Sequence, residues 1–227
     1  KKLKIVRVGS LDDKIRLGKI TASFFQVEHS IMDSMGVGIE TPGGTAIHPG
    51  DWTMERDKEG QTRLSYEMLA NKPRPTTLML ESLGAVSNKR HGTYEEMYEN
   101  LHGILKKASG RIIIGTFSSQ IERVKWVMYA ASKLGKKVAL DGYSMKMNVK
   151  IAQELGYIKI PQSTLIDIKD LNKHPEDKVV VICTGAQGEE NAVLMRIVNK
   201  THRFISLKKT DTVVVSSSII PGNERTI

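Results

Sequence analysis

Two side chains that metal ions favour flank a predicted hairpin in the first quarter of the chain. His29 follows a predicted strand, and Asp51 follows the turn sequence His-Pro-Gly. Imidazole nitrogen and carboxylate oxygen are good zinc ligands, and a carboxylate can bridge two ions that together activate a phosphoryl group. A hairpin folds back on itself and could bring its two ends together. The spacing therefore predicts part of a metal site; the alternative is that His29 ends a strand and Asp51 makes a turn.

Two turns rich in glycine and hydroxyl groups predict a second chemistry, the binding of phosphate. Residues 115–119 (GTFSS) follow one apolar run, and residues 184–188 (TGAQG) follow another. Both turns would lie at the carboxyl edge of an open parallel sheet, where ligands usually bind. Backbone N–H groups at helix starts attract anions, and hydroxyl groups could add donors. The alternative is ordinary helix capping by serine and chain reversal by glycine.

Single residues near these stretches give weaker signals. Glu81 follows a short apolar run and could act as an acid, a base or an orienting group, or could be a solvated strand end. Asn223 lies in a turn after a predicted strand and could reach a ligand at the same sheet edge. His91 lies in a basic loop that could touch phosphates. Cys183 lies inside an apolar run and is expected in the core. The histidines without partner spacing are expected to be structural or on the surface: His48, His102, His174 and His202.

The residues up to Glu81 predict mainly strands, which would place the metal-ligand candidates at strand ends. Residues 1–8 alternate basic and apolar side chains, as a half-buried strand does. The turn Thr41-Pro-Gly-Gly44 joins two short predicted strands. The expected elements here are strands over 1–8, 19–27, 36–40, 45–48 and 77–80, and a short helix or turn over 65–70.

After Glu81, helical periodicity alternates with short apolar strands. Thr93 and Glu96 form a capping box that opens a helix. The runs RIIIGT and KVVVICT are typical of parallel strands buried on both faces. The expected strands are 111–116, 137–140, 178–184, 204–207 and 211–217, and the expected helices begin at Thr93, at Ser118 or Ser119, at Ser144 and near Glu189. This alternation predicts a doubly wound parallel α/β layer.

Composition narrows the class of partner. The chain of 227 residues is long enough for one large domain or two small ones. No apolar run approaches the ~18 residues of a membrane span, and no signal peptide is visible, so no membrane partner is expected. The single cysteine excludes an internal disulfide framework and suits a reducing cytoplasm. A net charge of +9 favours a polyanionic partner, usually nucleic acid; the alternative is that the charge only keeps the protein soluble. With an aromatic content of 5%, base stacking on an aromatic platform is not the leading hypothesis.

The motifs, taken in order, resemble a known enzyme family. HSIMDS (29–34) and GDW (50–52) are similar to the later metal motifs of the metallo-β-lactamase superfamily. The segments that follow resemble the β-CASP nucleases, and most closely ribonuclease J. The matching segments are LES (80–82), GTFSSQIERV (115–124), KLGKKVAL (133–140), NVKIAQELGYIKIP (148–161), VVVICTGAQGE (179–189) and DTVVVSSSIIPGNE (211–224). The resemblance covers nearly the whole chain.

This resemblance implies an α/β fold in three parts. Residues 1–84 would be the β-rich end of the first metallo-β-lactamase segment. Residues 85–210 would be a doubly wound parallel α/β domain, the β-CASP domain. Residues 211–227 would be a strand that returns toward the metallo-β-lactamase domain.

The resemblance also implies an activity and roles for the candidate residues. The family's enzymes bind two zinc ions and cleave RNA as 5′-to-3′ exonucleases and endonucleases. His29 would be a zinc ligand, Asp51 a catalytic bridge between both ions, and Glu81 the counterpart of a β-CASP acidic residue that is usually Asp. The candidate contacts to RNA phosphates are Ser118, Ser119, Thr184, Gly185, Ala186, Gln187 and Gly188, to which the turn position adds Asn223. The parent protein would be cytoplasmic and homo-oligomeric.

The chain departs from the family pattern around the metal site. The signature His-x-His-x-Asp-His, which the family carries upstream, is absent, and the family's closing histidine motifs would lie beyond Ile227. Glu122 stands where the family often has His, and Ala186 where it often has Ser, which removes one possible phosphate donor. A zinc ion needs three or four ligands, so His29 and Asp51 cannot hold two ions alone. We therefore expect an internal piece of the enzyme that is inactive by itself.

Two other functions fit the same residues. One is a non-catalytic RNA-binding module that keeps the basic α/β layer without the metal site. The other is an α/β protein that binds a mononucleotide at the same sheet edge. The ribonuclease and the RNA-binding module both predict an affinity for RNA that falls steeply with salt. Comparing short 5′-phosphorylated RNA with free nucleotide would separate the mononucleotide-binding protein from them.

Overall fold

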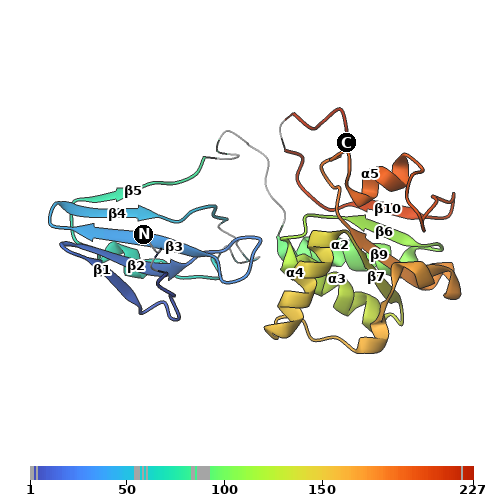
Figure 1. The fold of residues 1–227 in the computed structure, drawn as a ribbon, viewed down its shortest axis with the longest axis horizontal. Helices are drawn as coiled ribbons and strands as arrows, with labels where there is room; N and C mark the ends of the chain where they lie inside the picture. The colour runs from blue at the N-terminus through green and yellow to red at the C-terminus, as the bar shows by residue number, and fades with distance from the viewer. Residues whose placement is uncertain are drawn as a thin grey trace. The chain divides into compact units, whose positions relative to one another are not determined.

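The chain folds into two units, each built on its own five-stranded sheet (Figure 1). The computed structural model describes residues 3, 5–53, 57, 59, 61–82, 85, 93–220 and 222–227. The first unit is Lys1–Glu95 and the second is Glu96–Ile227. Within the described residues, none of the helices has the length and apolar character needed to cross a membrane.

The sheet of the first unit follows chain order, because each strand pairs with the next. It contains β1 (Lys14–Leu17), β2 (Ile20–Gln26), β3 (Met35–Thr41), β4 (Gly44–His48) and β5 (Thr76–Leu78). The first three pairings are antiparallel, and β5 joins β4 in parallel. The short helix α1 (Glu67–Ala70) lies between β4 and β5 in the chain. A small core of Phe25, Val27 and Ile47 packs with Trp52, Tyr66 and Leu69.

The predicted strand over residues 1–8 was wrong for the described residues of that segment. Residues 3 and 5–8 have no strand pairing, and the side chains of Leu3 and Ile5 are largely exposed. Alternation alone does not make a strand, which also needs a partner for its backbone groups. The first strand is instead β1, which pairs with β2 across a turn at Gly18 and Lys19. The other strands predicted for this unit were confirmed.

The second unit is a parallel α/β layer. Its strands are β6 (Ile112–Gly115), β7 (Lys137–Asp141), β8 (Leu165–Ile166), β9 (Val179–Cys183) and β10 (Thr212–Val215). Its helices are α2 (Tyr94–Lys107, which begins just before the unit boundary), α3 (Ile121–Lys133), α4 (Tyr143–Glu154) and α5 (Val193–Val198). Short 3-10 helices cover Gln162–Thr164, Ile168–Lys173 and Glu176–Lys178. The order is β10-β6-β9-β7-β8, with every pairing parallel.

Helices cover both faces of this sheet, which explains its continuous apolar strands. Every residue of β6 and β9 is buried. On one face, Ile113, Val181 and Cys183 pack with Val193 and Ile197 of α5. Figure 1 shows α2, α3 and α4 on the other side of the sheet. The predicted doubly wound parallel α/β architecture is confirmed.

Three local predictions in the second unit were wrong. Residues 204–207 form no strand, because the His202 ring accepts hydrogen bonds from the backbone N–H groups of Phe204 and Ile205. Helix α3 has Gln120 as its N-cap, not Ser118 or Ser119, and that residue makes no side-chain capping bond. Helix α5 begins only at Val193.

The predicted three-part division of the chain stays a prediction. In this structure β10 pairs with β6, so residues 212–215 belong to the sheet of the second unit. Contacts at the start of β10 help to hold this strand beside β6. The Arg111 guanidinium donates to both carboxylate oxygens of Asp211, at 2.9 and 2.6 Å, and Thr212 N donates to Arg111 O.

Candidate metal-ligand pair and phosphate-binding edge

Three candidate residues of the first unit follow strand ends at one edge of its sheet. β2, β4 and β5 run in the same direction, since β2 and β4 are both antiparallel to β3 and β5 is parallel to β4. His29 comes three residues after the end of β2, Asp51 three after β4, and Glu81 three after β5. The topology therefore directs all three positions to the same edge, and Glu81 is exposed there.

An isolated bridge brings His29 and Asp51 together. Glu28 pairs with Thr53 in antiparallel fashion, and the Thr53 N–H and hydroxyl both donate to Glu28 O, at 2.9 and 3.0 Å. His29 Nε2 then lies 3.8 Å from Asp51 Oδ2. The predicted approach of the two residues is thus present, although the bridge rather than the hairpin between β3 and β4 produces it.

Neighbouring side chains fix the position of Asp51. Trp52 packs on the small core, and its indole N–H donates to the Tyr66 hydroxyl at 3.1 Å. On the other side, Gly50 N donates to the His48 ring at 2.9 Å. With Trp52 turned inward, the Asp51 side chain is 84% exposed, whereas that of His29 is 32% exposed. His48 has the structural role expected of it.

The pair fits two of the positions around a zinc ion and no more. Zinc binds imidazole nitrogen and carboxylate oxygen at ~2.0–2.2 Å, so donors 3.8 Å apart can reach one ion. Across the described residues, no group of three or more His, Cys, Asp or Glu side chains could hold a metal. Since a zinc ion takes three or four ligands, the pair by itself is not a complete zinc site, and its role as metal ligands stays a prediction.

The carboxyl edge of the second sheet gathers hydroxyl groups and one guanidinium. The Thr116 hydroxyl, just after β6, donates to Ser216 O at 2.9 Å, just after β10. Arg123 of α3 donates to the same carbonyl at 2.6 Å. Sequence reasoning missed Arg123, although it lies in the matched segment GTFSSQIERV, in the first turn of the helix after the serines.

The predicted phosphate contacts at this edge differ in their exposure. Ser118, Ser119 and Thr184 are partly exposed, so their hydroxyl groups can be reached from solvent. Asn148 of α4 donates to Ser118 O at 2.8 Å and so fixes the turn between β6 and α3. Gly188 is partly exposed, whereas Gly185, Ala186 and Gln187 are buried.

Glycine is required at position 185 of this edge. Gly185 has φ +110°, and a Cβ there would lie 2.9 Å from Ala192 Cβ and 3.0 Å from Leu194 Cβ. The glycine therefore lets the turn pass close to the start of α5. No helix begins directly after TGAQG, so the expected helix N-terminus beside this turn is absent.

The Gln187 side chain is buried and holds a loop in place. It is 4% exposed, and its amide N–H groups donate to Ser217 Oγ and Ser218 O, at 3.1 and 2.7 Å. Its amide oxygen accepts from Ile220 N at 2.8 Å and from Asn223 Nδ2 at 3.4 Å. All the hydrogen-bonding positions of the side chain are occupied. Gln187 therefore positions residues 217–220 and Asn223, and in this arrangement its side chain has no donor left for a phosphate.

A buried aspartate–histidine pair lies beside the same edge. His202 Nε2 is 2.8 Å from Asp141 Oδ2, at the end of β7. Because His202 Nδ1 accepts backbone N–H groups, Nε2 carries the ring proton and donates it to Asp141. Burial opposes ionisation of Asp141, but the bonds from His202 and Gly142 N and the nearby Lys146 charge together hold its pKa below the usual value. No spacing pattern in the sequence indicates a partner for His202.

Comparison with known proteins places the chain in a family. The model of the ribonuclease J β-CASP domain matches residues 109–227. The chain belongs to the ribonuclease J family. The expected resemblance is thereby confirmed, and the matched region includes the whole carboxyl edge of the second sheet.

Several ribonuclease J proteins are similar over most of the chain. That of Helicobacter pylori (strain J99) is 34% identical over 215 residues, covering 94% of this chain and 31% of the relative. That of Thermus thermophilus is 36% identical over 225 residues, covering 96% of this chain and 38% of the relative. The chain thus spans about a third of the length of these curated relatives.

One solved structure supports the fold. A crystal structure of a protein of unknown function from Enterococcus faecalis V583 matches with a TM-score of 0.58 and 17% sequence identity. The match covers 80% of this chain and 45% of that chain.

Proposed function

We propose that the full-length protein containing this chain is a metal-dependent ribonuclease that hydrolyses RNA phosphodiester bonds. The observation that carries the proposal is the common sheet edge of His29, Asp51 and Glu81 in a chain of the ribonuclease J family. The printed name of the relatives, ribonuclease J, supports RNA as the substrate. The net charge of +9 agrees with a polyanionic substrate.

His29 and Asp51 are the residues of this chain that would hold zinc. The exposed Asp51 carboxylate has room to bridge two ions, while His29 would bind one. Bound zinc supplies Lewis-acid activation of the phosphate and a hydroxide at neutral pH. Glu81, after β5, would orient the reacting groups or exchange a proton. A count of two zinc ions and a combination of 5′-to-3′ exonuclease and endonuclease activity are parts of this proposal.

The carboxyl edge of the second sheet would hold the RNA backbone. The hydroxyl groups of Ser118, Ser119 and Thr184 would donate to phosphate oxygens, and Arg123 adds positive charge beside them. Gly188, which is partly exposed, would contribute backbone contacts, and Gly185 and Ala186 would shape the turn beside it. Gln187 and Asn223 would act through the loop that they position.

The 227-residue chain alone would bind RNA without cleaving it. Its described residues provide two donors at the predicted metal site, fewer than one zinc ion requires. This count favours the non-catalytic RNA-binding module as a description of the chain by itself. A cytoplasmic location and a homo-oligomeric state of the full-length protein remain predictions.

The test compares RNA cleavage by the full-length protein and by this chain. In the full-length protein, Asp51→Ala is expected to slow cleavage of 5′-phosphorylated RNA by at least about a hundredfold, since even indirect damage to a metal site costs ~10–100-fold. Asp12→Ala, a change at an exposed aspartate of the same unit, is the matched control and should leave cleavage unchanged. Unaltered cleavage by the Asp51 variant, or cleavage by the isolated chain with about two bound zinc ions, would refute the proposal.

A further inference from the structure

The outward face of α3 carries aromatic side chains that its core packing does not require. Ile121, Val124 and Met128 are buried on the side that faces the sheet. The residues at 122, 125, 126 and 129 follow the spacing i, i+3, i+4, i+7 and form a separate stripe. A solvent-facing stripe is usually charged, yet this one includes Trp126 and Tyr129, whose side chains are partly exposed or exposed.

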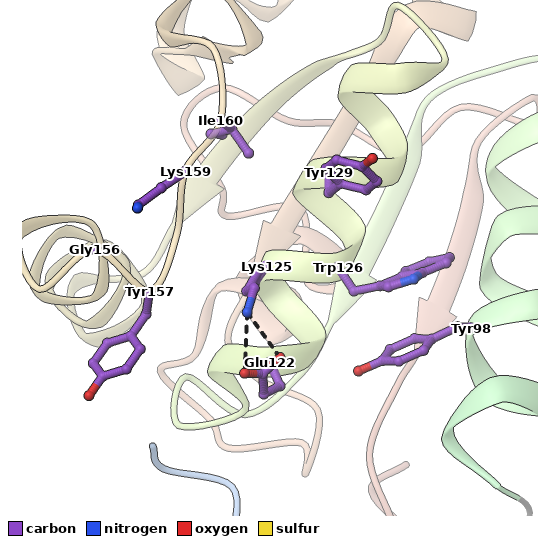
Figure 2. A pocket seen from close by; sticks show the side chains of 9 residues that line it. All are labelled: Tyr98, Glu122, Lys125, Trp126, Tyr129, Gly156, Tyr157, Lys159 and Ile160. Atoms are coloured by element: carbon purple, nitrogen blue, oxygen red, sulfur yellow. Dashed lines mark hydrogen bonds and ion pairs between the residues drawn. The ribbon is translucent and has the colours of Figure 1, made fainter. Parts of the chain in front are cut away.

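This stripe forms the floor of an aromatic pocket of about 390 Å³. The pocket is lined by Tyr98, Glu122, Lys125, Trp126, Tyr129, Gly156, Tyr157, Lys159 and Ile160. Figure 2 shows Tyr98 reaching the stripe from α2 on one side and the segment after α4 on the other. All of these residues belong to the second unit.

The pocket concentrates the few aromatic residues of the chain. Of the 12 Phe, Trp and Tyr residues, all of which the structure describes, four line it. Tyr98 and Trp126 stack with centroids 4.7 Å apart and an interplanar angle of 10°. The chain therefore has a local aromatic cluster despite its low aromatic content, because composition does not report where side chains gather.

Cations accompany the rings. Lys125 and Lys159 line the pocket, and Lys133 Nζ lies 5.4 Å from the centre of the Tyr129 ring. Lys125 is also 3.4 Å from the Glu122 carboxylate, with both side chains close to half exposed. Such a pair is weak in water, so Lys125 can turn to another anion. Flat rings beside flexible lysines can bind a ligand that has a planar base and a phosphate.

We propose that the aromatic pocket binds one nucleotide of single-stranded RNA. The base stacks on the aromatic side chains, and Lys125 and Lys159 neutralise the phosphate. The proposal rests on the proposed function in taking RNA as the ligand. Adjacent residues of α3 serve the two regions, because Arg123 reaches Ser216 at the carboxyl edge while Glu122 lines the pocket. An RNA strand bound at the carboxyl edge of the second sheet would thus have a second binding site beside the same helix, α3.

Trp126 provides a direct signal for this binding. The chain has two tryptophans, and Trp52 lies in the first unit, so Trp52→Phe leaves Trp126 as the single reporter. The Trp52→Phe variant of the full chain is titrated with a short oligoadenylate, with adenosine monophosphate and with inorganic polyphosphate. A metal chelator is present, so that no metal-dependent cleavage occurs. We expect saturable quenching of Trp126 by the oligoadenylate, weaker quenching by the mononucleotide and none by polyphosphate, because only a base can stack on the ring.

Substitutions in the pocket separate stacking at this site from binding elsewhere. Tyr129→Ala and Lys159→Gln change exposed residues and should weaken oligoadenylate binding, the former by at least about fivefold. Phe204→Ala and Lys150→Gln are the matched controls, since both residues are exposed and neither lines the pocket. Circular dichroism checks that all variants fold, and Trp126 itself is retained because it packs on Tyr98.

The outcomes distinguish this proposal from the nuclease proposal. Weaker binding by the two pocket variants supports the pocket even if the full-length protein proves not to cleave RNA, since the assay needs neither metal nor cleavage. Quenching by the free nucleotide without quenching by oligoadenylate would overturn RNA as the ligand in favour of a mononucleotide. Pocket variants that bind oligoadenylate as tightly as their controls would overturn the site itself.

Discussion

Burial makes the one thiol of the chain unreactive. Cys183 is 0% exposed at the end of β9, and burial, with the nearby Asp141 charge adding to it, raises its pKa to about 12. The nucleophilic thiolate is then scarce at mildly alkaline pH. We expect iodoacetamide to leave the native protein unmodified and to label it fully in guanidinium chloride, as measured by intact mass. Labelling of the native protein at the rate of the unfolded chain would contradict this.

Gln187 shows which part of a site the sequence can predict. The glycine-rich turn after an apolar run is a local pattern, so its place at the sheet edge could be expected. The partners of the Gln187 amide, in contrast, lie about 30 residues further along the chain. Nothing in the local pattern indicates that long-range contact. For the same reason the partner of His202 could not be predicted from the sequence, since Asp141 is 61 residues away.

At the scale of elements, alanine substitutions at two glycines are expected to change the free energy of unfolding in opposite directions. Gly103 lies inside α2 with open space around its Cα, so Gly103→Ala should raise the free energy of unfolding by ~0.5–1 kcal/mol through lower chain entropy. Gly36 in β3 lies under the Phe25 ring, and a Cβ there would come 2.2 Å from it. Gly36→Ala should therefore lower that free energy by ~1–3 kcal/mol.

Denaturant titration of both glycine variants measures the two effects. Each substitution adds one methyl group, so each variant is a control for the other. A loss of stability in the Gly103 variant would show that its helix position is constrained after all. An unchanged Gly36 variant would show that the Phe25 ring can move aside without cost.

Strands that are buried on both faces were the elements most reliably predicted. The runs in β6 and β9 are continuously apolar because helices cover both sides of the sheet, and this leaves a strong trace in the sequence. Residues 1–8 alternate basic and apolar side chains and residues 204–207 are mostly apolar, but such short segments become strands only where a partner strand is available. The 3-10 helices and the two-residue strand β8 are too short to produce a periodic pattern.

At the scale of the whole molecule, each unit has its own core and its own tryptophan. Phe25, Val27 and Ile47 form the buried cluster of the first unit, which Trp52 joins. The second unit has a larger buried cluster around β9, and Trp126 lies on α3. Separate cores allow separate unfolding transitions. Trp52→Phe and Trp126→Phe would therefore give one fluorescence reporter for each unit.

Acid should weaken the second unit through Asp211. Its side chain is 1% exposed and bonds to Arg111, which is 5% exposed. Burial alone would raise the pKa of Asp211, but the bonds from Arg111 and Lys208 N and the Arg111 charge hold it below its usual value. A carboxyl group with a lowered pKa in the folded state stabilises fully above its unfolded pKa. That contribution is lost as pH falls through the folded pKa.

Asp211→Ala tests this contribution and the attachment of β10. Removing one partner leaves Arg111 buried without its counter-charge, so the unfolding free energy reported by Trp126 should fall by ~3–5 kcal/mol near neutral pH. As the pH falls below about 4, the variant should also lose less stability than the parent. The reason is that it lacks the Asp211 carboxylate, which takes up a proton when the parent unfolds in acid. The change reported by Trp52 should be smaller, since Asp211 belongs to the other unit. Equal changes at both tryptophans would show instead that the two units unfold as one.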